Sequence, residues 1–170
     1  EKMERPLEEV KQEVLEFFKV RYQNFLLEKG YPYDVVEAVL STPFDDLLDL
    51  QNRIEALEKV KDREDFKSIV IGFKRAMNIL KGIVLNKGIR PSLFSHPAEE
   101  ELFEAWRKTK EKVDYSLSQK NYASALLEMS QLRQPIDQFF DRVLVMVEDE
   151  EVRSNRLALL KEITQLFLRF

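Results

Sequence analysis

Apolar residues recur along most of this chain at intervals of three and four positions, the spacing of one face of an α-helix. The first such segment covers residues 7–29 and stops before Gly30, a residue that commonly follows a helix end. A short helix is predicted for residues 34–40, with Asp34 as its N-cap. No segment alternates with a period of two for long enough to predict a strand. The pattern therefore predicts an all-α protein.

Capping residues mark where further helices start. Thr42 followed by Pro43 predicts the start of a third helix, which continues to about residue 61. A fourth helix is predicted over residues 64–85, before the Asn-Lys-Gly turn signal. After a loop, Pro97 opens a fifth helix, because proline is well tolerated at the first helical position.

The C-terminal third of the chain continues the same pattern. A sixth helix covers residues 121–132, Pro135 separates it from a seventh over residues 136–147, and the last helix begins near Asp149. We interpret the whole chain, residues 1–170, as a single bundle of about seven to eight helices. Because it opens without methionine and stops inside an apolar pattern, we expect it to be a fragment of a longer chain.

Charge is distributed unevenly along the sequence. The formal net charge is −4, with 27 basic and 31 acidic residues. The segment 66–98 contains no acid but six basic residues: Lys67, Lys74, Arg75, Lys81, Lys87 and Arg90. The remaining 21 basic residues stand against all 31 acids, so the rest of the chain is strongly acidic. The sequence thus predicts one positive patch on an acidic body.

Much of that patch falls on one side of the predicted fourth helix. At 100° per residue, its polar positions lie within roughly 40° of one direction, opposite the apolar face: Lys67, Lys74, Asn78 and Lys81. Arg75 lies at the edge of this stripe. A solvated helix face is the simplest interpretation, although such faces usually mix acids with bases. A basic stripe free of acids suits a polyanion, whose phosphates would pair with the lysines.

Residue types that support catalysis are scarce. There is no cysteine, and the single histidine, His96, stands before Pro97 as expected of a residue at a helix N-terminus. The four glycines lie too far apart for a nucleotide-binding loop. The acids at 148–151 suit the N-terminus of a helix, where they complement its dipole. The sequence predicts neither an active site nor a metal site.

No apolar run approaches the roughly 20 residues that cross a bilayer, and no signal-peptide pattern is present. Without cysteines, the chain is compatible with a reducing compartment. We therefore expect a cytoplasmic protein without a membrane partner. The net charge of −4 argues against indiscriminate binding of nucleic acid, and DNA is not expected as a partner.

Arg156 occupies a surprising position on the predicted last helix. It falls within the apolar arc that includes Leu159 and Leu160. A buried guanidinium is costly unless a carboxylate pairs with it. We predict a structural ion pair between Arg156 and Asp141 of the preceding helix, with Asp137 as the other possible partner.

Three segments together resemble a known family. They are "DDLLDLQNRIEAL" at 45–57, "FKRAMNIL" at 73–80 and "ALLEMSQLRQPIDQFFDRVLVMVEDEEVRSNRLALL" at 125–160. Their order is similar to the C-terminal region of the β subunit of bacterial glycyl-tRNA synthetases, a helical anticodon-binding domain of the DALR type. The resemblance implies a non-catalytic domain of an α2β2 ligase that joins glycine to its tRNA. The α subunit of such an enzyme binds the ATP and magnesium, and this fragment would hold no cofactor.

The resemblance gives the basic stripe a specific RNA ligand, glycine tRNA. Glycine codons begin with GG, so the anticodon carries two cytosines, each of which offers both hydrogen-bond donors and acceptors. Asn78 can serve both, and is the predicted base reader beside Lys74, Arg75 and Lys81. The predicted phosphate contacts are Lys67, Lys87 and Arg90, with Arg142 and Arg153 as second-rank candidates.

A rival interpretation is left open by the residues themselves. The segment 121–132 has the character of one helix from a tetratricopeptide repeat, although no second copy follows. On that interpretation the chain is an acidic helical module that docks onto another protein, for instance the other subunit.

Overall fold

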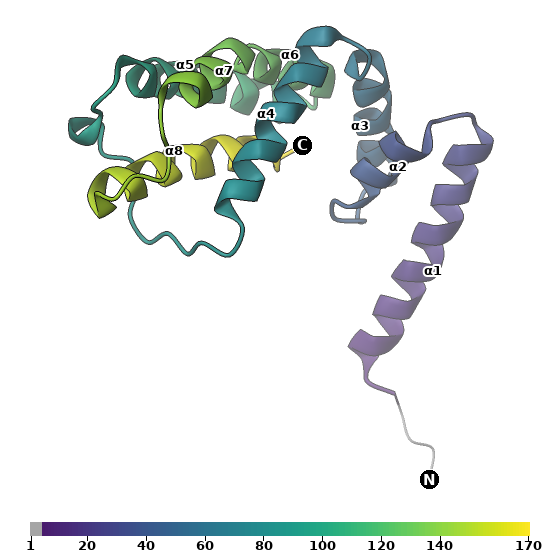
Figure 1. Cartoon of the computed structure of the whole chain (residues 1–170). Helices are drawn as coiled ribbons and strands as arrows, with labels where there is room; N and C mark the ends of the chain where they lie inside the picture. Colours follow the sequence, from purple (N-terminus) through teal and green to yellow (C-terminus); the bar gives the residue numbers. More distant parts are fainter. Residues whose placement is uncertain (1–4) are drawn as a thin grey trace. The chain divides into compact units, whose positions relative to one another are not determined.

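The computed structural model describes residues 5–170, and within them the chain forms eight α-helices, one 3₁₀ helix and no strand. The all-α prediction of seven to eight helices is confirmed (Figure 1). The helices are α1 (Leu7–Glu28), α2 (Tyr33–Leu40), α3 (Leu47–Val60), α4 (Glu64–Leu80), α5 (Pro97–Ser118), α6 (Tyr122–Ser130), α7 (Arg133–Arg142) and α8 (Glu150–Phe167). The 3₁₀ helix η1 (Pro91–Leu93) lies between α4 and α5.

Contacts divide the helices into two compact units, with the boundary between residues 58 and 59 inside α3. The sequence predicts a single domain over residues 1–170. In unit 1, which holds α1 and α2 and most of α3, the core is formed mainly by α2, where Val36 and Val39 are buried. Of the apolar residues on α1, only Leu26 is buried, whereas Phe17 and Phe18 are 54% and 55% exposed.

The predicted start of the third helix at Thr42 is wrong. The helix begins at Leu47, because the Asp46 carboxylate accepts hydrogen bonds from the amides of Leu48 and Asp49, each at 3.0 Å. The Thr42 hydroxyl instead donates to the Val39 carbonyl at the end of α2, 2.7 Å away. Thr42 therefore closes one helix rather than opening the next.

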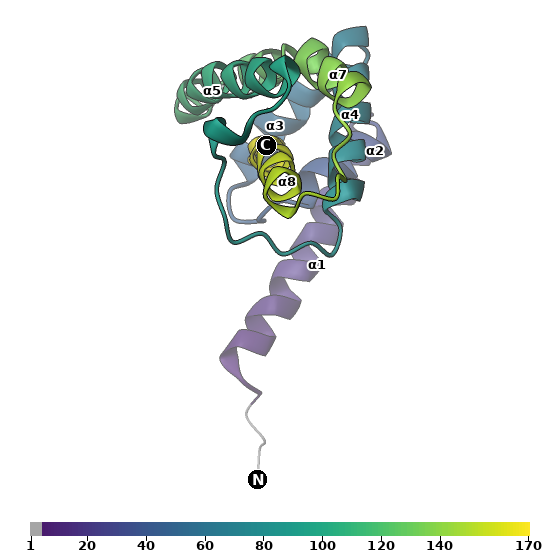
Figure 2. The same ribbon diagram turned by 60° about the vertical axis from the view of Figure 1, so that its left-hand side comes forward.

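Helix α8 lies at the centre of unit 2. Figure 2 looks almost along it and shows α5, α7, α4 and the segment after α4 arranged around it. Nine of its eighteen residues are buried, including the polar residues Asn155 and Arg156. The Asp149 carboxylate caps α8, accepting from the amides of Glu151 and Val152 at 2.9 and 3.0 Å. The predicted start of the last helix is thus confirmed.

Helix α4 ends at Leu80, five residues before the predicted end at residue 85. The chain turns there because Gly82 adopts a left-handed conformation, with φ of 77°, which costs glycine little. The following segment is held to α8 by side-chain hydrogen bonds. Asn155 accepts from the Arg90 amide at 2.7 Å and donates to the Arg90 carbonyl at 3.1 Å, and Lys161 donates to the Leu85 carbonyl.

The seventh helix differs from its predicted bounds of 136–147 at both ends. It starts at Arg133 and carries Pro135 in its first turn, where a missing N–H breaks no helical hydrogen bond. It stops at Arg142, and residues 143–149 form a non-helical connection to α8. In this connection apolar side chains alternate: Val143 and Val145 are each 6% exposed, while their neighbours Leu144 and Met146 are 71% and 56% exposed. The valines face the core and their neighbours face solvent.

Helices α4 and α7 approach each other closely at Gly72. A Cβ atom added to Gly72 would lie 2.8 Å from Cγ2 of Ile136, which is too close for an ordinary contact. Ile136 is buried and Gly72 lies on the buried face of α4. The absence of a side chain at this position therefore sets the separation of the two helices.

The buried Arg156 pairs with a residue that the sequence did not indicate. Arg156 is 7% exposed, as its position predicted, but it pairs with Glu99 of α5 and not with Asp141 or Asp137. Its Nε lies 2.9 Å from Oε1 of Glu99, while the Ser95 hydroxyl and the Leu144 carbonyl accept from its terminal nitrogens at 2.8 and 2.9 Å.

The predicted Arg156–Asp141 pair is therefore wrong, because Asp141 lies on the exposed side of α7. The fully buried Glu99 carboxylate also accepts from the amides of Ser95 and His96, at 2.9 and 2.8 Å. Burial tends to raise the pKa of Glu99. The hydrogen bonds from Arg156 and the two amides outweigh that effect and hold this pKa below its usual value.

Candidate nucleic-acid interface

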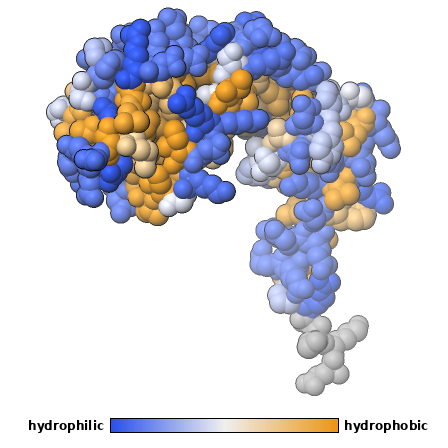
Figure 3. Space-filling view, viewed as in Figure 1, coloured by the Kyte–Doolittle hydropathy of each residue, from blue (hydrophilic) through white to orange (hydrophobic). Residues whose placement is uncertain are grey.

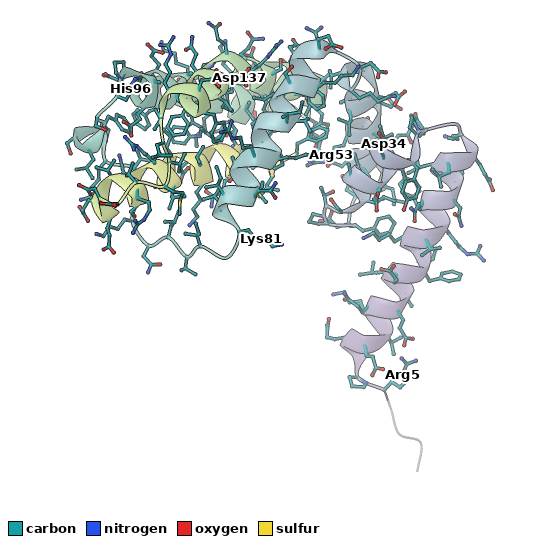
Figure 4. The ribbon with its side chains drawn as sticks, in the orientation of Figure 1. Arg5, Asp34, Arg53, Lys81, His96 and Asp137 are labelled. Carbon is teal, nitrogen blue, oxygen red and sulfur yellow. The ribbon has the colours of Figure 1, made fainter. Side chains whose placement is uncertain are left out.

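The predicted basic stripe is present on the exposed side of α4 and just beyond its end. Four exposed residues form what we call the α4 stripe: Lys74, Arg75, Asn78 and Lys81. On the opposite side of α4, Ile69, Gly72 and Ala76 are buried, so packing of that side fixes which way the stripe faces. Figure 4 labels Lys81 at the C-terminal end of the helix.

The α4 stripe keeps its positive charge. Among residues 5–170, no carboxylate forms an ion pair with Lys74, Arg75 or Lys81. Ile71, one turn before Arg75, is 69% exposed and adds an apolar side chain to this surface. The described part of the chain thus presents three unpaired cations and one amide together on a protein of net charge −4.

The three predicted phosphate contacts are placed differently. Lys67 is exposed on the first turn of α4, where its ammonium lies 3.6 Å from the Glu64 carboxylate. Lys87 and Arg90 meet at Glu151, with nitrogen–oxygen distances of 2.7 and 2.5 Å. Hydrogen bonds from Lys87 and Arg90 hold the pKa of the Glu151 carboxyl below its usual value. Part of the positive charge predicted from segment 66–98 is therefore balanced at the start of α8.

The two second-rank arginines also differ from each other. Arg153 donates to the Val147 carbonyl at 2.8 Å and lies 3.6 Å from the Glu150 carboxylate, so it helps to hold the connection between α7 and α8. Arg142 is exposed at the end of α7 and forms no ion pair among the described residues. Arg142 thus remains a cation available to a ligand, whereas Arg153 is engaged.

A groove adjoins the α4 stripe. It has a volume of about 440 Å³ and lies between α4, the end of α7 and the connection that follows it. We call it the α4–α7 groove; its lining residues are Arg75, Ile79 and residues 140–146. Cζ of Arg75 lies 4.2 Å from the centroid of the Phe140 ring, so the guanidinium stacks on the aromatic face.

The sequence did not indicate that Asp141, Arg142 and Arg75 would lie together in one groove. The segment "VLVMV" at 143–147 has β-branched residues at alternate positions and is compatible with an extended form, but it suits a buried helix as well, so no local signal indicates the groove. In Figure 3, hydrophobic surface gathers over the part of unit 2 that contains α8 and the connection before it, bordered by hydrophilic residues.

The described residues form no metal site and no membrane-spanning helix. Within residues 5–170, no three His, Cys, Asp or Glu side chains gather closely enough to hold a metal ion. His96 acts as the N-cap of α5, since its Nδ1 accepts from the Ala98 amide at 3.1 Å. None of the described helices is long and apolar enough to span a membrane.

Comparison with protein families gives this helical unit a class. Residues 69–169 match the model of the DALR anticodon binding domain, which extends from α4 to α8. The match includes more than half of the chain, so the chain belongs to the DALR anticodon binding domain family. The match contains both the α4 stripe and the α4–α7 groove.

Individual relatives are more specific. The chain is 44% identical over 169 residues to the glycine–tRNA ligase beta subunit of Syntrophus aciditrophicus, and 43% identical over 168 residues to that of Trichlorobacter lovleyi. In each case the alignment covers 99% of this chain and 24% of the relative. The beta subunit of Moorella thermoacetica is 40% identical over 162 residues. The chain therefore spans about a quarter of the length of the curated relatives it matches.

Proposed function

We propose that this chain is the anticodon-binding part of a glycine–tRNA ligase β subunit and helps the enzyme select glycine tRNA. The α4 stripe carries this proposal, because Lys74, Arg75 and Lys81 keep unpaired positive charge within a region that matches an anticodon-binding family. Lysines and arginines hold the phosphates of RNA, while exposed bases are read by side chains that offer both donors and acceptors. In this role Asn78 reads a base and the three cations hold the backbone.

The proposal also concerns the other subunit of the enzyme. Aminoacylation with ATP and magnesium takes place in an α subunit, with which the β subunit forms an α2β2 assembly in the cytoplasm. The residues of this chain do not gather into a metal site in the described range, and we assign them no catalytic step. Their role is to bind and position the tRNA.

Docking of a protein onto an acidic helical surface is the alternative. The family match favours RNA, since residues 69–169, which match an anticodon-binding family, include the α4 stripe. Docking of a protein partner would not by itself explain the three unpaired cations of the α4 stripe.

Titration with a glycine-tRNA anticodon stem-loop at several salt concentrations tests the proposal. Each lysine that contacts a phosphate contributes about 0.7–0.9 to the slope of log K against log[salt]. Lys74→Gln and Lys81→Gln should each lower the slope by about that amount. Lys112→Gln is the matched control, because Lys112 is an exposed lysine on α5 that pairs with Glu128 at 3.1 Å.

Asn78→Ala should leave the salt slope unchanged but reduce the preference for cytosine at one anticodon position. If the stem-loop does not bind, or if Lys112→Gln changes the slope as much as Lys74→Gln does, the α4 stripe is not the RNA contact. Binding that is equal for every RNA would reduce its role to electrostatic attraction.

A further inference from the structure

The α4–α7 groove has walls suited to a flat ring with a polar edge. The Arg75 guanidinium lies over the Phe140 ring, with its Cζ 4.2 Å from the ring centroid, and provides a planar surface. Leu144 lines the groove and is 71% exposed, and Met146 is 56% exposed. Exposed apolar side chains that gather into one patch rimmed by polar residues can mark a binding surface.

These apolar side chains are fixed in position by the backbone that carries them. Val143 and Val145 anchor the connection in the core, so the residues between and after them must face outward. Arg156 donates to the carbonyl of Leu144 at 2.9 Å. The outward-facing wall is therefore held by a buried arginine, and does not need to form when a ligand arrives.

The groove carries side chains of opposite charge that do not pair with each other. Asp141 and Arg142 are both exposed, and neither forms an ion pair or hydrogen bond with another described residue. Asp137, one turn earlier on α7, differs because it lies 3.7 Å from Arg133. The groove thus offers a carboxylate that only accepts hydrogen bonds and guanidinium groups that only donate them.

We propose that the α4–α7 groove binds one unstacked cytosine of the anticodon, with Asp141 as the residue that distinguishes it from uracil. This inference rests on the proposed function and adds to it a base-binding site that does not include Asn78. The ring of the base lies against the Arg75–Phe140 surface and Leu144. Asp141 accepts from the N4 amino group, and Arg142 supplies donors to the O2 and N3 acceptors.

Uracil is disfavoured by the charge of Asp141. At the position where cytosine carries an amino donor, uracil carries a carbonyl oxygen, which would face the carboxylate without a proton between them. Pairings of this kind discriminate between bases by roughly 5- to 150-fold. Arg75 connects the two parts of the interface, because it belongs to the α4 stripe and also lines the groove. Phosphates then lie along the stripe while a neighbouring base enters the groove.

The test compares binding of glycine-tRNA anticodon stem-loops in which either cytosine is replaced by uracil. For one of the two positions, the unmodified chain should prefer cytosine by roughly 5- to 150-fold. Asp141→Asn should bring that ratio close to one, because an amide can donate to the uracil oxygen. Asp141→Glu, which keeps the carboxylate, should restore part of the preference.

The matched control is Asp137→Asn, which makes the same chemical change one turn away and should leave the ratio unaltered. Leu144→Ala should weaken binding of all the stem-loops by a similar factor without changing the ratio, since it removes apolar contact and no hydrogen bond. Asp141→Asn should keep the thermal midpoint of the unmodified chain, because the exposed Asp141 has no partner among the described residues.

The outcomes separate the two proposals. If Lys74→Gln lowers the salt slope but Asp141→Asn leaves the cytosine preference intact, the groove does not read a base and only the present inference fails. A protein segment would then be the better candidate for its occupant. If the stem-loops do not bind the chain at all, this inference and the proposed function fail together.

Discussion

Arg156→Leu removes a guanidinium to which three parts of unit 2 are attached. The side chain pairs with Glu99 at 2.9 Å and also donates to the Ser95 hydroxyl and the Leu144 carbonyl. Both charges are almost inaccessible, with side chains 8% and 1% exposed. Removing one member of a buried ion pair commonly costs about 3–5 kcal/mol of unfolding free energy. Glu99 retains its two amide donors, so we expect a loss near 3 kcal/mol.

Urea denaturation followed by tryptophan fluorescence measures this loss of stability in unit 2. Trp106 is the only tryptophan in the chain and lies on α5 in unit 2. The double variant Glu99→Leu with Arg156→Leu should cost less than the sum of the two single variants, because it leaves no charge unpaired. Asp141→Ala is the control and should change the unfolding free energy by less than about 0.5 kcal/mol.

The pH dependence provides a second measurement of the same pair. The pKa of Glu99 is lowered on folding, so the pair stabilises the protein above the unfolded-state pKa of about 4.3. That stabilisation is lost as the pH falls through the lower pKa of the folded state. The difference in unfolding free energy between the unmodified chain and Glu99→Gln should be large at pH 7 and should decrease as the pH falls below about 4.

Two results would refute this reasoning. If Arg156→Leu cost less than about 1 kcal/mol, the buried pair would add little to stability. If Asp141→Ala were as costly as Arg156→Leu, Asp141 would have a structural role that its exposed position does not explain.

Two further predictions concern the charge and the packing around α4. Glu151→Gln should strengthen RNA binding and steepen its salt dependence, because Lys87 and Arg90 lose their shared carboxylate; titration across salt concentrations measures both effects. Unchanged binding would mean that neither residue lies near the RNA. Gly72→Ala should lower the unfolding free energy by about 1–3 kcal/mol, because the added methyl group would meet Ile136 at 2.8 Å. A calorimetric midpoint equal to that of the unmodified chain would contradict the close approach.

Helix starts were predictable where a neighbouring side chain makes the cap. His96 and Pro97 define the start of α5, and the Asp149 carboxylate bonds amides two and three residues ahead. Such contacts join residues only two or three positions apart, so the local sequence indicates them. The start of α3 was predicted wrongly, because Thr42 before Pro43 has the form of an N-cap, whereas the Thr42 hydroxyl donates to the Val39 carbonyl and the Asp46 carboxylate caps α3.

The end of α7 could not be predicted from local sequence. Residues 143–147 are apolar throughout and suit a buried helix as well as an extended segment. The extended form is stabilised from outside, since Arg156 and Arg153 on α8 donate to the carbonyls of Leu144 and Val147. Which structure forms therefore depends on side chains of a later helix.

Of the two parts of the candidate site, one could be predicted from the sequence and the other could not. The α4 stripe could be predicted because its residues follow one helical period, so a single angle calculation groups them. The α4–α7 groove could not, because residues 75 and 140–146 are distant in the sequence. Helical period likewise predicted that Arg156 is buried, but its partner Glu99 lies 57 residues away on another helix, and only the fold brings them together.

The alternation of residues 143–146 makes the length of this connection as important as its composition. Val143 and Val145 point inward while Leu144 and Met146 point outward, so inserting or deleting one residue would exchange the two sets. Substituting one exposed side chain should be tolerated far better than shifting the frame by one position. Chains related to this one can therefore vary the chemistry of the outward positions, but only while the count of residues between α7 and α8 keeps the valines inside.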